Sequence, residues 1–210
     1  MEFFEAIHTR KTIRKYKQEH PPTEDIKKII NSARLAPSAT NSQNWKFIAI
    51  YNDAIKQKMA KAVETAYDDF LQIVDDEEIK KGIAKYKTFS TFFKDAPVVI
   101  ACIETERKSM MTEFMKSKGV PYEEILLYRP DSSLLSMGAA IENMSLSATV
   151  LGYGTCWLCA PIIAYKEFKN ILKLKENDKI VSLLALGKPE NNNTQQPPKK
   201  SLEEVMCIIE

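Results

Sequence analysis

Two short, unbroken apolar runs constrain the fold of this chain more than any other feature. Residues 98–103 read Val-Val-Ile-Ala-Cys-Ile, and residues 180–186 form a second run of similar character. A strand without alternating polar residues is typical of a sheet whose two faces are both covered. The sequence therefore predicts strands that lie in the interior of a central sheet.

Helical patterns surround these runs. Five segments show helical spacing or composition: residues 26–33, 55–70, 77–93, 131–151 and 165–174. A strand is expected over residues 45–51, and a helix that begins at Phe3 is expected to run into the basic cluster that follows it. This order of helices and strands predicts an α+β, or mixed α/β, sheet protein.

Composition narrows the class of protein. The 210 residues are 44% hydrophobic and 28% charged, which suits a single globular domain over residues 1–210. The formal net charge of +2 argues against a general polyanion binder, so no nucleic-acid partner is expected. The N-terminus shows no signal-peptide pattern and no segment is apolar enough to span a bilayer. We therefore expect a cytoplasmic protein without a membrane partner.

Several common kinds of site are disfavoured. The chain has two histidines, His8 and His20, which makes a hydrolytic triad improbable. Gly152-Tyr-Gly154 lacks the third glycine of a dinucleotide fingerprint. Cys156 and Cys159 form one CxxC pair, which is too few ligands for zinc, so no metal site is expected. The pair is read as small hydrophobic residues rather than as a redox dithiol.

Four other segments are informative, and the first two of them allow two readings each. The basic cluster over residues 10–17 is either the solvated end of a helix or a phosphate site that includes the Thr12 hydroxyl. The polar loop over residues 38–44 is either a plain turn or a ligand-binding loop. The charged, methionine-rich segment 104–130 is predicted to be an insertion or lid. The polar segment 191–210 ends in apolar residues, which suits an arm that packs on a second subunit.

These segments together resemble the FMN-dependent nitroreductase family. Arg10-Lys-Thr-Ile-Arg14 is similar to its RRSxR motif, and residues 33–45 are similar to its A-x-x-APS-x-x-NSQPW signature. Residues 151–158 resemble the LGLGSCWI stretch, residues 186–189 resemble LGYP, and residues 199–205 resemble the C-terminal basic arm.

The resemblance implies a fold and an activity. It implies a central mixed sheet flanked by helices, in a domain-swapped homodimer with FMN at the subunit interface. It also implies an oxidoreductase that takes hydride from NAD(P)H and reduces a small acceptor, a nitroaromatic, quinone or enone, by a ping-pong mechanism. The cofactor carries the chemistry, so no catalytic side chain is expected. The alternative is a non-catalytic flavin-binding protein for storage or sensing.

The resemblance also implies the residues that bind the cofactor. The phosphate and the polar flavin edge would be held by Arg10, Lys11, Thr12 and Arg14. The other subunit would supply Pro37, Ser38, Ala39, Thr40 and Asn41. Backbone groups near the flavin N5 would come from Leu158, Cys159 and Ala160, and further phosphate contacts from Lys199 and Lys200. Cys159-Ala160 departs from the Gly-Gly or Glu-Gly of many members, which would narrow the space over N5 or place a thiol beside it.

Overall fold

The computed structural model describes residues 1–191 and 196–210. Its centre is a four-stranded sheet in the order β1–β2–β4–β3. The strands are β1 (Trp45–Ile50), β2 (Val98–Glu104), β3 (Gly154–Leu158) and β4 (Lys179–Gly187). Every neighbouring pair is antiparallel, and a parallel bridge between Thr12 and Thr155 extends the sheet beyond β3. The expected α+β fold is confirmed, and among the described residues this isolated bridge is the only parallel pairing beside the antiparallel strands.

The two apolar runs occupy the two central strands, as predicted. In β2 every residue from Val98 to Ile103 is buried, and β4 is buried along most of its length. Alternate residues of β2 point to opposite faces, so that Ile100 and Ala101 join different hydrophobic clusters. Both faces of the central strands therefore need a layer of helices.

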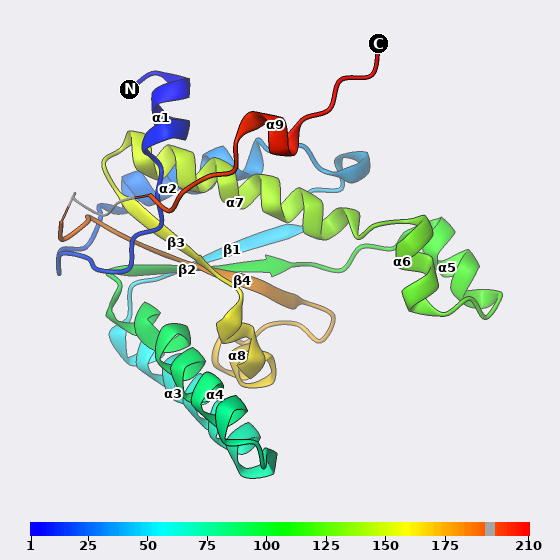
Figure 1. Cartoon of the computed structure of the whole chain (residues 1–210), viewed down its shortest axis with the longest axis horizontal. Helices are drawn as coiled ribbons and strands as arrows, with labels where there is room; N and C mark the ends of the chain where they lie inside the picture. Colours follow the sequence, from blue (N-terminus) through cyan, green and yellow to red (C-terminus); the bar gives the residue numbers. More distant parts are fainter. Residues whose placement is uncertain (192–195) are drawn as a thin grey trace.

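The helices form these two layers (Figure 1). One face carries α2 (Thr23–Arg34) and α7 (Ser132–Val150), which supply one cluster of buried side chains. The other face carries α3 (Asp53–Ile73) and α8 (Tyr165–Ile171), which supply the second cluster. The helix α4 (Glu77–Thr91) packs alongside α3. Within residues 1–191 and 196–210, no helix is both long and apolar enough to cross a membrane.

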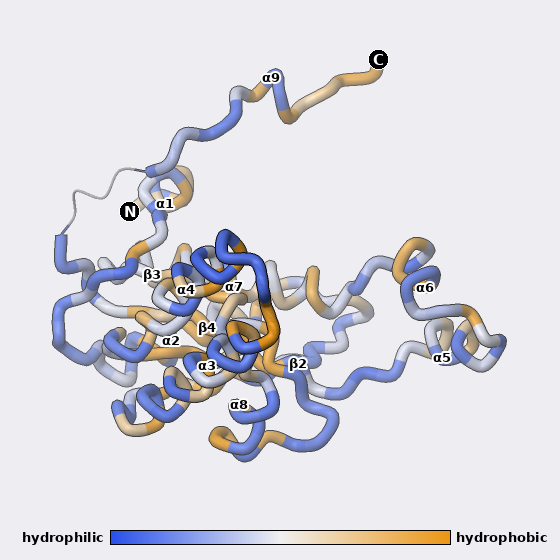
Figure 2. The backbone as a smooth tube through the Cα atoms, turned by 60° about the horizontal axis from the view of Figure 1, so that its bottom comes forward, coloured by the Kyte–Doolittle hydropathy of each residue, from blue (hydrophilic) through white to orange (hydrophobic). Residues whose placement is uncertain are grey.

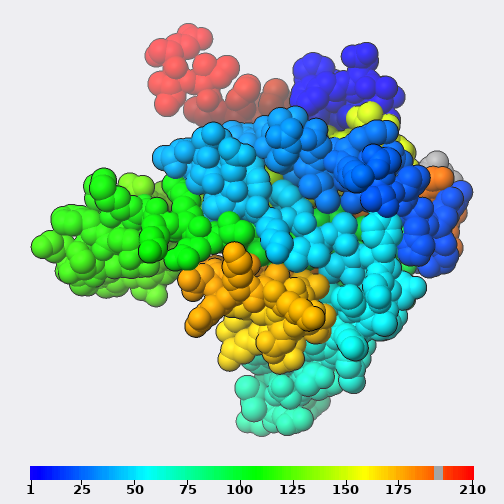
Figure 3. Space-filling view, turned by 180° about the vertical axis from the view of Figure 1, so that it is seen from behind, coloured from blue at the N-terminus to red at the C-terminus, as the bar shows by residue number. Residues whose placement is uncertain are grey.

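The segment 104–130 projects sideways from this body, as Figure 3 shows from behind. It contains two short helices, α5 (Met110–Ser117) and α6 (Tyr122–Tyr128). Neither helix has a buried residue except Ile125. The predicted insertion is thus a helical projection with little contact to the core.

The C-terminal segment runs away from the body and ends in hydrophobic residues (Figure 2). Residues 196–210 are all exposed and include the short helix α9 (Leu202–Val205). The predicted arm over 191–210 also includes residues 192–195, which lie outside the described residues. Exposed side chains such as Ile208 and Ile209 have no cover within the described part of this chain.

The N-terminal helix corrects one expectation. The helix α1 (Phe3–Thr9) ends before the basic cluster, so the cluster is not helical. Instead the chain runs beside the sheet edge, where the Ile13 amide donates to the Thr155 carbonyl at 2.8 Å. Ile13 and Tyr16 are buried against the sheet, and this long-range packing overrides the local helical pattern.

Candidate functional site

A glycine in β3 determines where the basic segment lies. A Cβ atom at Gly154 would be 2.4 Å from Ile13 Cγ1 and 2.7 Å from Ile13 Cβ. Only glycine permits so close an approach of the Ile13 side chain to the backbone of β3. The approach allows the bridge between Thr12 and Thr155, and it places Arg14 beside the end of β3.

Arg14 lines a cavity of about 450 Å³. We call it the Arg14 cavity. One wall comes from the end of β3 and the turn after it: Cys156, Trp157, Leu158, Cys159 and Ala160. The opposite wall comes from α4: Gly82, Lys85, Tyr86 and Phe89. The described lining contains two cations and no carboxylate, so the cavity favours an anionic or electron-rich ligand.

The volume suits a small-molecule cofactor. Ligand sites in proteins typically enclose about 300 to 1,000 Å³ and combine apolar walls with a few polar groups. The Arg14 cavity meets both conditions, because aromatic and aliphatic side chains accompany its two cations. The residues present therefore fit the ring of a flavin, with Arg14 available to its polar edge.

The two cysteines of this wall differ in environment. Cys156 is buried within β3, and burial raises the pKa of its thiol to about 11, although the charge of Arg14 opposes the shift. Cys159 is exposed, and both thiols are free. A thiol with so high a pKa is a poor nucleophile at neutral pH. The pair is therefore unsuited to dithiol redox chemistry, as the strand context predicts.

The other predicted phosphate ligands lie near Arg14 in sequence but make other contacts. Arg10 Nε pairs with Glu142 Oε1 of α7 at 3.1 Å. Lys11 and Thr12 are half-buried, and Thr12 forms the bridge with Thr155. Lys199 and Lys200 lie exposed on the arm. The chain that leads to these lysines passes α1, where Gln196 donates to the Arg10 carbonyl at 3.0 Å.

The predicted loop residues 37–41 lie in a different place. None of them lines the Arg14 cavity in the described structure. The Ala39 amide donates to Ser136 Oγ at 3.2 Å, near the start of α7. Thr40 and Asn41 have φ angles of 56° and 50°. This left-handed backbone conformation is uncommon for residues other than glycine, and least favourable for β-branched residues such as threonine. Such strain is often kept at ligand-binding loops.

Arg107 joins this loop to the projecting segment. Its guanidinium donates to Ser132 Oγ at 2.8 Å and to Thr40 Oγ1 at 3.4 Å. Sequence reasoning did not single out Arg107, because its two partners are distant in sequence. The arginine therefore holds the base of the projection against the loop and the first turn of α7.

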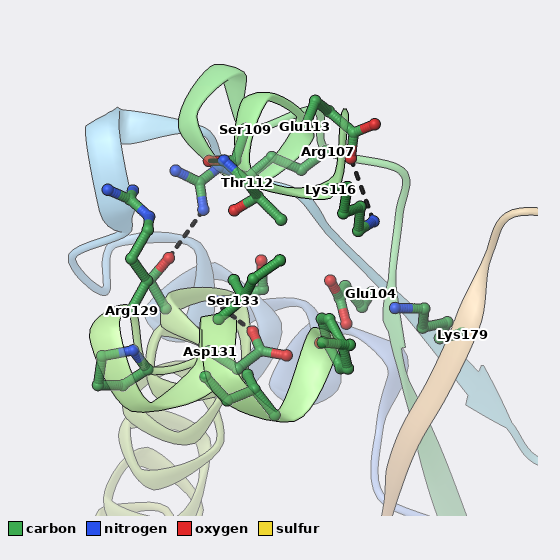
Figure 4. Close-up of a pocket in the computed structure, with 15 residues that line it drawn as sticks. Glu104, Arg107, Ser109, Thr112, Glu113, Lys116, Arg129, Asp131, Ser133 and Lys179 are labelled. Carbon is green, nitrogen blue, oxygen red and sulfur yellow. Dashed lines mark hydrogen bonds and ion pairs between the residues drawn. The ribbon is translucent and has the colours of Figure 1, made fainter. Parts of the chain in front are cut away.

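A second cavity lies between the projection and α7 (Figure 4). Its volume is about 150 Å³, well below the range of cofactor sites. Some of its charged residues have partners: Lys116 Nζ lies 3.2 Å from Glu113 Oε1, and Asp131 accepts the Ser133 and Leu134 amides at the start of α7. This cavity is too small to hold a flavin.

The structure thus brings together one part of the predicted site and leaves the others apart. Arg14 and residues 158–160 share one cavity. Arg10 and residues 37–41 contact α7 at separate positions. Sequence reasoning missed the α4 wall, although the spacing of Gly82, Lys85, Tyr86 and Phe89 marks one helix face.

Known proteins resemble this chain over most of its length. The sequence model described as the nitroreductase family matches residues 7–188. A crystal structure of a BluB-like flavoprotein from Clostridium difficile 630 is 31% identical, with a TM-score of 0.88 and complete coverage of both chains. A putative NADH dehydrogenase/NAD(P)H nitroreductase of Archaeoglobus fulgidus is 28% identical over 90% of this chain and 87% of that protein. An iodotyrosine deiodinase of Hydra vulgaris is 27% identical over 98% of this chain and 72% of that protein.

Proposed function

Because this chain belongs to the nitroreductase family, we propose that it is an FMN-dependent oxidoreductase that uses NAD(P)H to reduce a small acceptor. The observation that carries the proposal is the Arg14 cavity. Arg14 and the turn after β3 both line it, and its described lining contains no carboxylate. The similarity to the BluB-like flavoprotein from Clostridium difficile supports a flavin cofactor, and the similarity to the putative NADH dehydrogenase/NAD(P)H nitroreductase of Archaeoglobus fulgidus supports the donor. The acceptor class is a nitroaromatic, quinone or enone.

The protein's part in this chemistry is to bind and orient. When bound, FMN would supply the redox chemistry, receiving hydride from the donor and giving electrons to the acceptor in a ping-pong cycle. Arg14 would stabilise negative charge at the polar edge of the ring, and the backbone of Leu158, Cys159 and Ala160 would border N5. No side chain of this chain acts as a nucleophile in the proposal.

The phosphate would be held by Arg10, Lys11 and Thr12, with Lys199 or Lys200 of an arm. In the single chain Arg10 is paired with Glu142, whose side chain is 46% exposed. An ion pair this open to solvent is weak, so a phosphate dianion can displace Glu142 at low cost. The proposed phosphate site is therefore compatible with the pair that the structure contains.

A homodimer is part of the proposal. Pro37, Ser38, Ala39, Thr40 and Asn41 do not line the Arg14 cavity of their own chain, so contact with the same cofactor requires a second subunit. Exposed apolar side chains on α7, such as Leu134 and Leu135, offer a surface for that subunit. The exposed C-terminal arm would wrap the partner. The free thiols of the chain suit a reducing compartment such as the cytoplasm.

Visible absorbance of the purified protein tests the cofactor and the donor. We expect a flavin band that bleaches when NADH or NADPH is added without oxygen. Arg14→Gln should weaken FMN binding about tenfold or more, because a charge-assisted contact is worth about 1.5 to 3 kcal/mol. Lys15→Gln is the matched control, since Lys15 is the exposed neighbour outside the cavity lining.

The outcomes separate the proposal from its alternatives. A flavin band that persists with both donors would favour a storage or sensing protein. Absence of a flavin band, even after incubation with FMN, would contradict the cofactor assignment itself. Equal FMN affinity in the Arg14 and Lys15 variants would contradict the role of Arg14.

A further inference from the structure

The helix α4 has two distinct faces. One face is attached to α3: Lys87 Nζ lies 2.5 Å from Asp68 Oδ1, and the Ser90 and Tyr67 hydroxyls are 3.0 Å apart. Ile83 packs against the hydrophobic core on the same side. These residues are three and four positions apart, which is the spacing of one helix face. The packing on α3 therefore fixes the rotation of α4.

The second face points into the Arg14 cavity. Gly82, Lys85, Tyr86 and Phe89 follow the i, i+3, i+4, i+7 pattern and all line the cavity. Tyr86 is 63% exposed and Phe89 is 52% exposed, although both rings are large and apolar. Aromatic rings held beside a cavity provide flat surfaces against which another ring can stack.

Gly82 has no conformational reason to be glycine. It lies in the interior of α4, its φ angle is not positive, and a Cβ atom there would meet nothing within 4 Å. A helix with glycine in its interior is less stable than one with alanine there, so Gly82 lowers the stability of α4. The benefit is space, because a longer side chain at position 82 would occupy the cavity.

Lys85 gives this wall a charge. The described lining of the cavity holds Arg14 and Lys85 as cations and no carboxylate to neutralise them. In the proposed function Arg14 serves the polar edge of the flavin. Lys85 then remains to pair with a negative group on whatever molecule occupies the rest of the cavity.

We propose that Gly82, Lys85, Tyr86 and Phe89 form the acceptor-binding wall and select a flat aromatic acceptor that carries a carboxylate or similar anionic group. The acceptor ring lies against Tyr86 and Phe89, its anionic group pairs with Lys85, and Gly82 leaves room for the ring. This inference rests on the proposed function and names the substrate class of the same site.

Equilibrium binding tests the wall without turnover. Benzoate and benzamide have the same ring and nearly the same shape, and they differ in charge. Titration calorimetry with the full-length protein loaded with FMN should show tighter binding of benzoate. Lys85→Gln should reduce that preference about threefold to tenfold, the range for an ion pair that is partly open to solvent. Lys81→Gln, an exposed lysine of α4 outside the lining, should keep it.

A second variant tests the space. Gly82→Leu should weaken binding of both ligands at least tenfold while the helix content measured by circular dichroism is kept, because leucine favours helices more than glycine does. Steady-state reduction of 4-nitrobenzoate and 4-nitrobenzamide should follow the same order. The ratio of their kcat/KM values should fall in Lys85→Gln and stay constant in Lys81→Gln.

Three results would overturn the proposal: an unchanged benzoate preference in Lys85→Gln, equal binding of both ligands by the unmodified protein, or a change confined to the KM of the nicotinamide donor. Failure of the proposed function is recognised separately, because the flavin band and its bleaching by NAD(P)H are recorded first. If no flavin binds, the same titrations on the flavin-free protein still decide whether the wall prefers the anion.

Discussion

Gly154 is the residue that controls the position of Arg14. Its missing side chain lets Ile13 approach to a distance that any Cβ atom would forbid. We expect Gly154→Ala to lower the free energy of unfolding by about 1 to 3 kcal/mol, as overpacking commonly does. We also expect weaker FMN binding, since the segment that carries Arg14 must move away from β3. Urea unfolding and a fluorescence titration with FMN measure the two effects.

Gly82→Ala is the control for this change. A Cβ atom at position 82 meets no neighbour within 4 Å, so the substitution should raise stability by up to about 1 kcal/mol through helix propensity. The two glycines therefore have opposite expected signs. Equal unfolding curves for Gly154→Ala and the unmodified protein would show that the close approach to Ile13 is unimportant.

Tyr153 links the turn before β3 to α2. Its hydroxyl donates to Asp25 Oδ2 at 2.8 Å, and burial, followed by the nearby Asp25, raises the pKa of Tyr153 to about 12. The usual tyrosine pKa is about 10, so the folded state favours the neutral phenol. The stabilisation of the folded state that comes from this pKa difference is fully present below about pH 10 and is lost as the pH rises from about 10 through 12.

Tyr153→Phe tests this assignment. At pH 8 the variant should be less stable than the unmodified protein by about 1.5 to 3 kcal/mol, the range for a hydrogen bond to a charged group. The difference should shrink between about pH 10 and about pH 12, as the tyrosine ionises in the unfolded chain. Denaturant unfolding at several pH values measures it, with Tyr165→Phe, an exposed tyrosine, as the control. A difference that stays constant with pH would contradict the assignment.

At the scale of elements, the sequence predicts most helices and strands because each has a local pattern. The apolar run over 98–103 becomes β2, and the expected helix over 131–151 becomes α7 (Ser132–Val150), whose first turn is capped by Asp131. The expectation that the N-terminal helix runs into the basic segment was wrong, because the conformation of this segment depends on β3, which lies far away in sequence. The face of α4 that lines the cavity was missed for a similar reason. The opposite wall belongs to β3, and the sequence of α4 alone does not show which element that helix faces.

The projecting helices α5 and α6 depend on a single buried side chain. Ile125 is 1% exposed, whereas Met110 on α5 is 84% exposed. We expect Ile125→Ala to destabilise the projection by about 2 to 4 kcal/mol, a typical cost for truncating a buried isoleucine. Met110→Ala should change stability by less than about 0.5 kcal/mol.

Hydrogen exchange distinguishes local from global loss. In Ile125→Ala the amides of residues 110–128 should exchange faster while those of β2 and β4 keep their protection, since the projection opens separately from the core. In Met110→Ala both regions should match the unmodified protein. Equal acceleration across the sheet and the projection would show that the two regions unfold together.

At the scale of the whole molecule, the proposed cofactor site would need two chains. Ser38 has the residue type of the family signature, yet its Oγ accepts from the Gln43 amide. The nearby Thr40 accepts from Arg107, and neither residue lines the Arg14 cavity. A sequence motif can indicate that two segments bind the same ligand, but it does not show whether both segments belong to the same chain. The sequence therefore predicts which residues would bind the cofactor, but it does not predict how two chains would bring them together.

The exposed arm provides the test of the assembly. Ile208 is 69% exposed and Ile209 is 95% exposed, although burying one isoleucine contributes about 1.5 to 3 kcal/mol. If the arm packs on a second subunit, Ile208→Asp combined with Ile209→Asp should weaken the dimer at least tenfold and weaken FMN binding with it. Sedimentation velocity over a range of protein concentrations, together with the flavin absorbance, measures both. Glu210→Gln is the control, and unchanged sedimentation of the double variant would show that these isoleucines do not hold the subunits together.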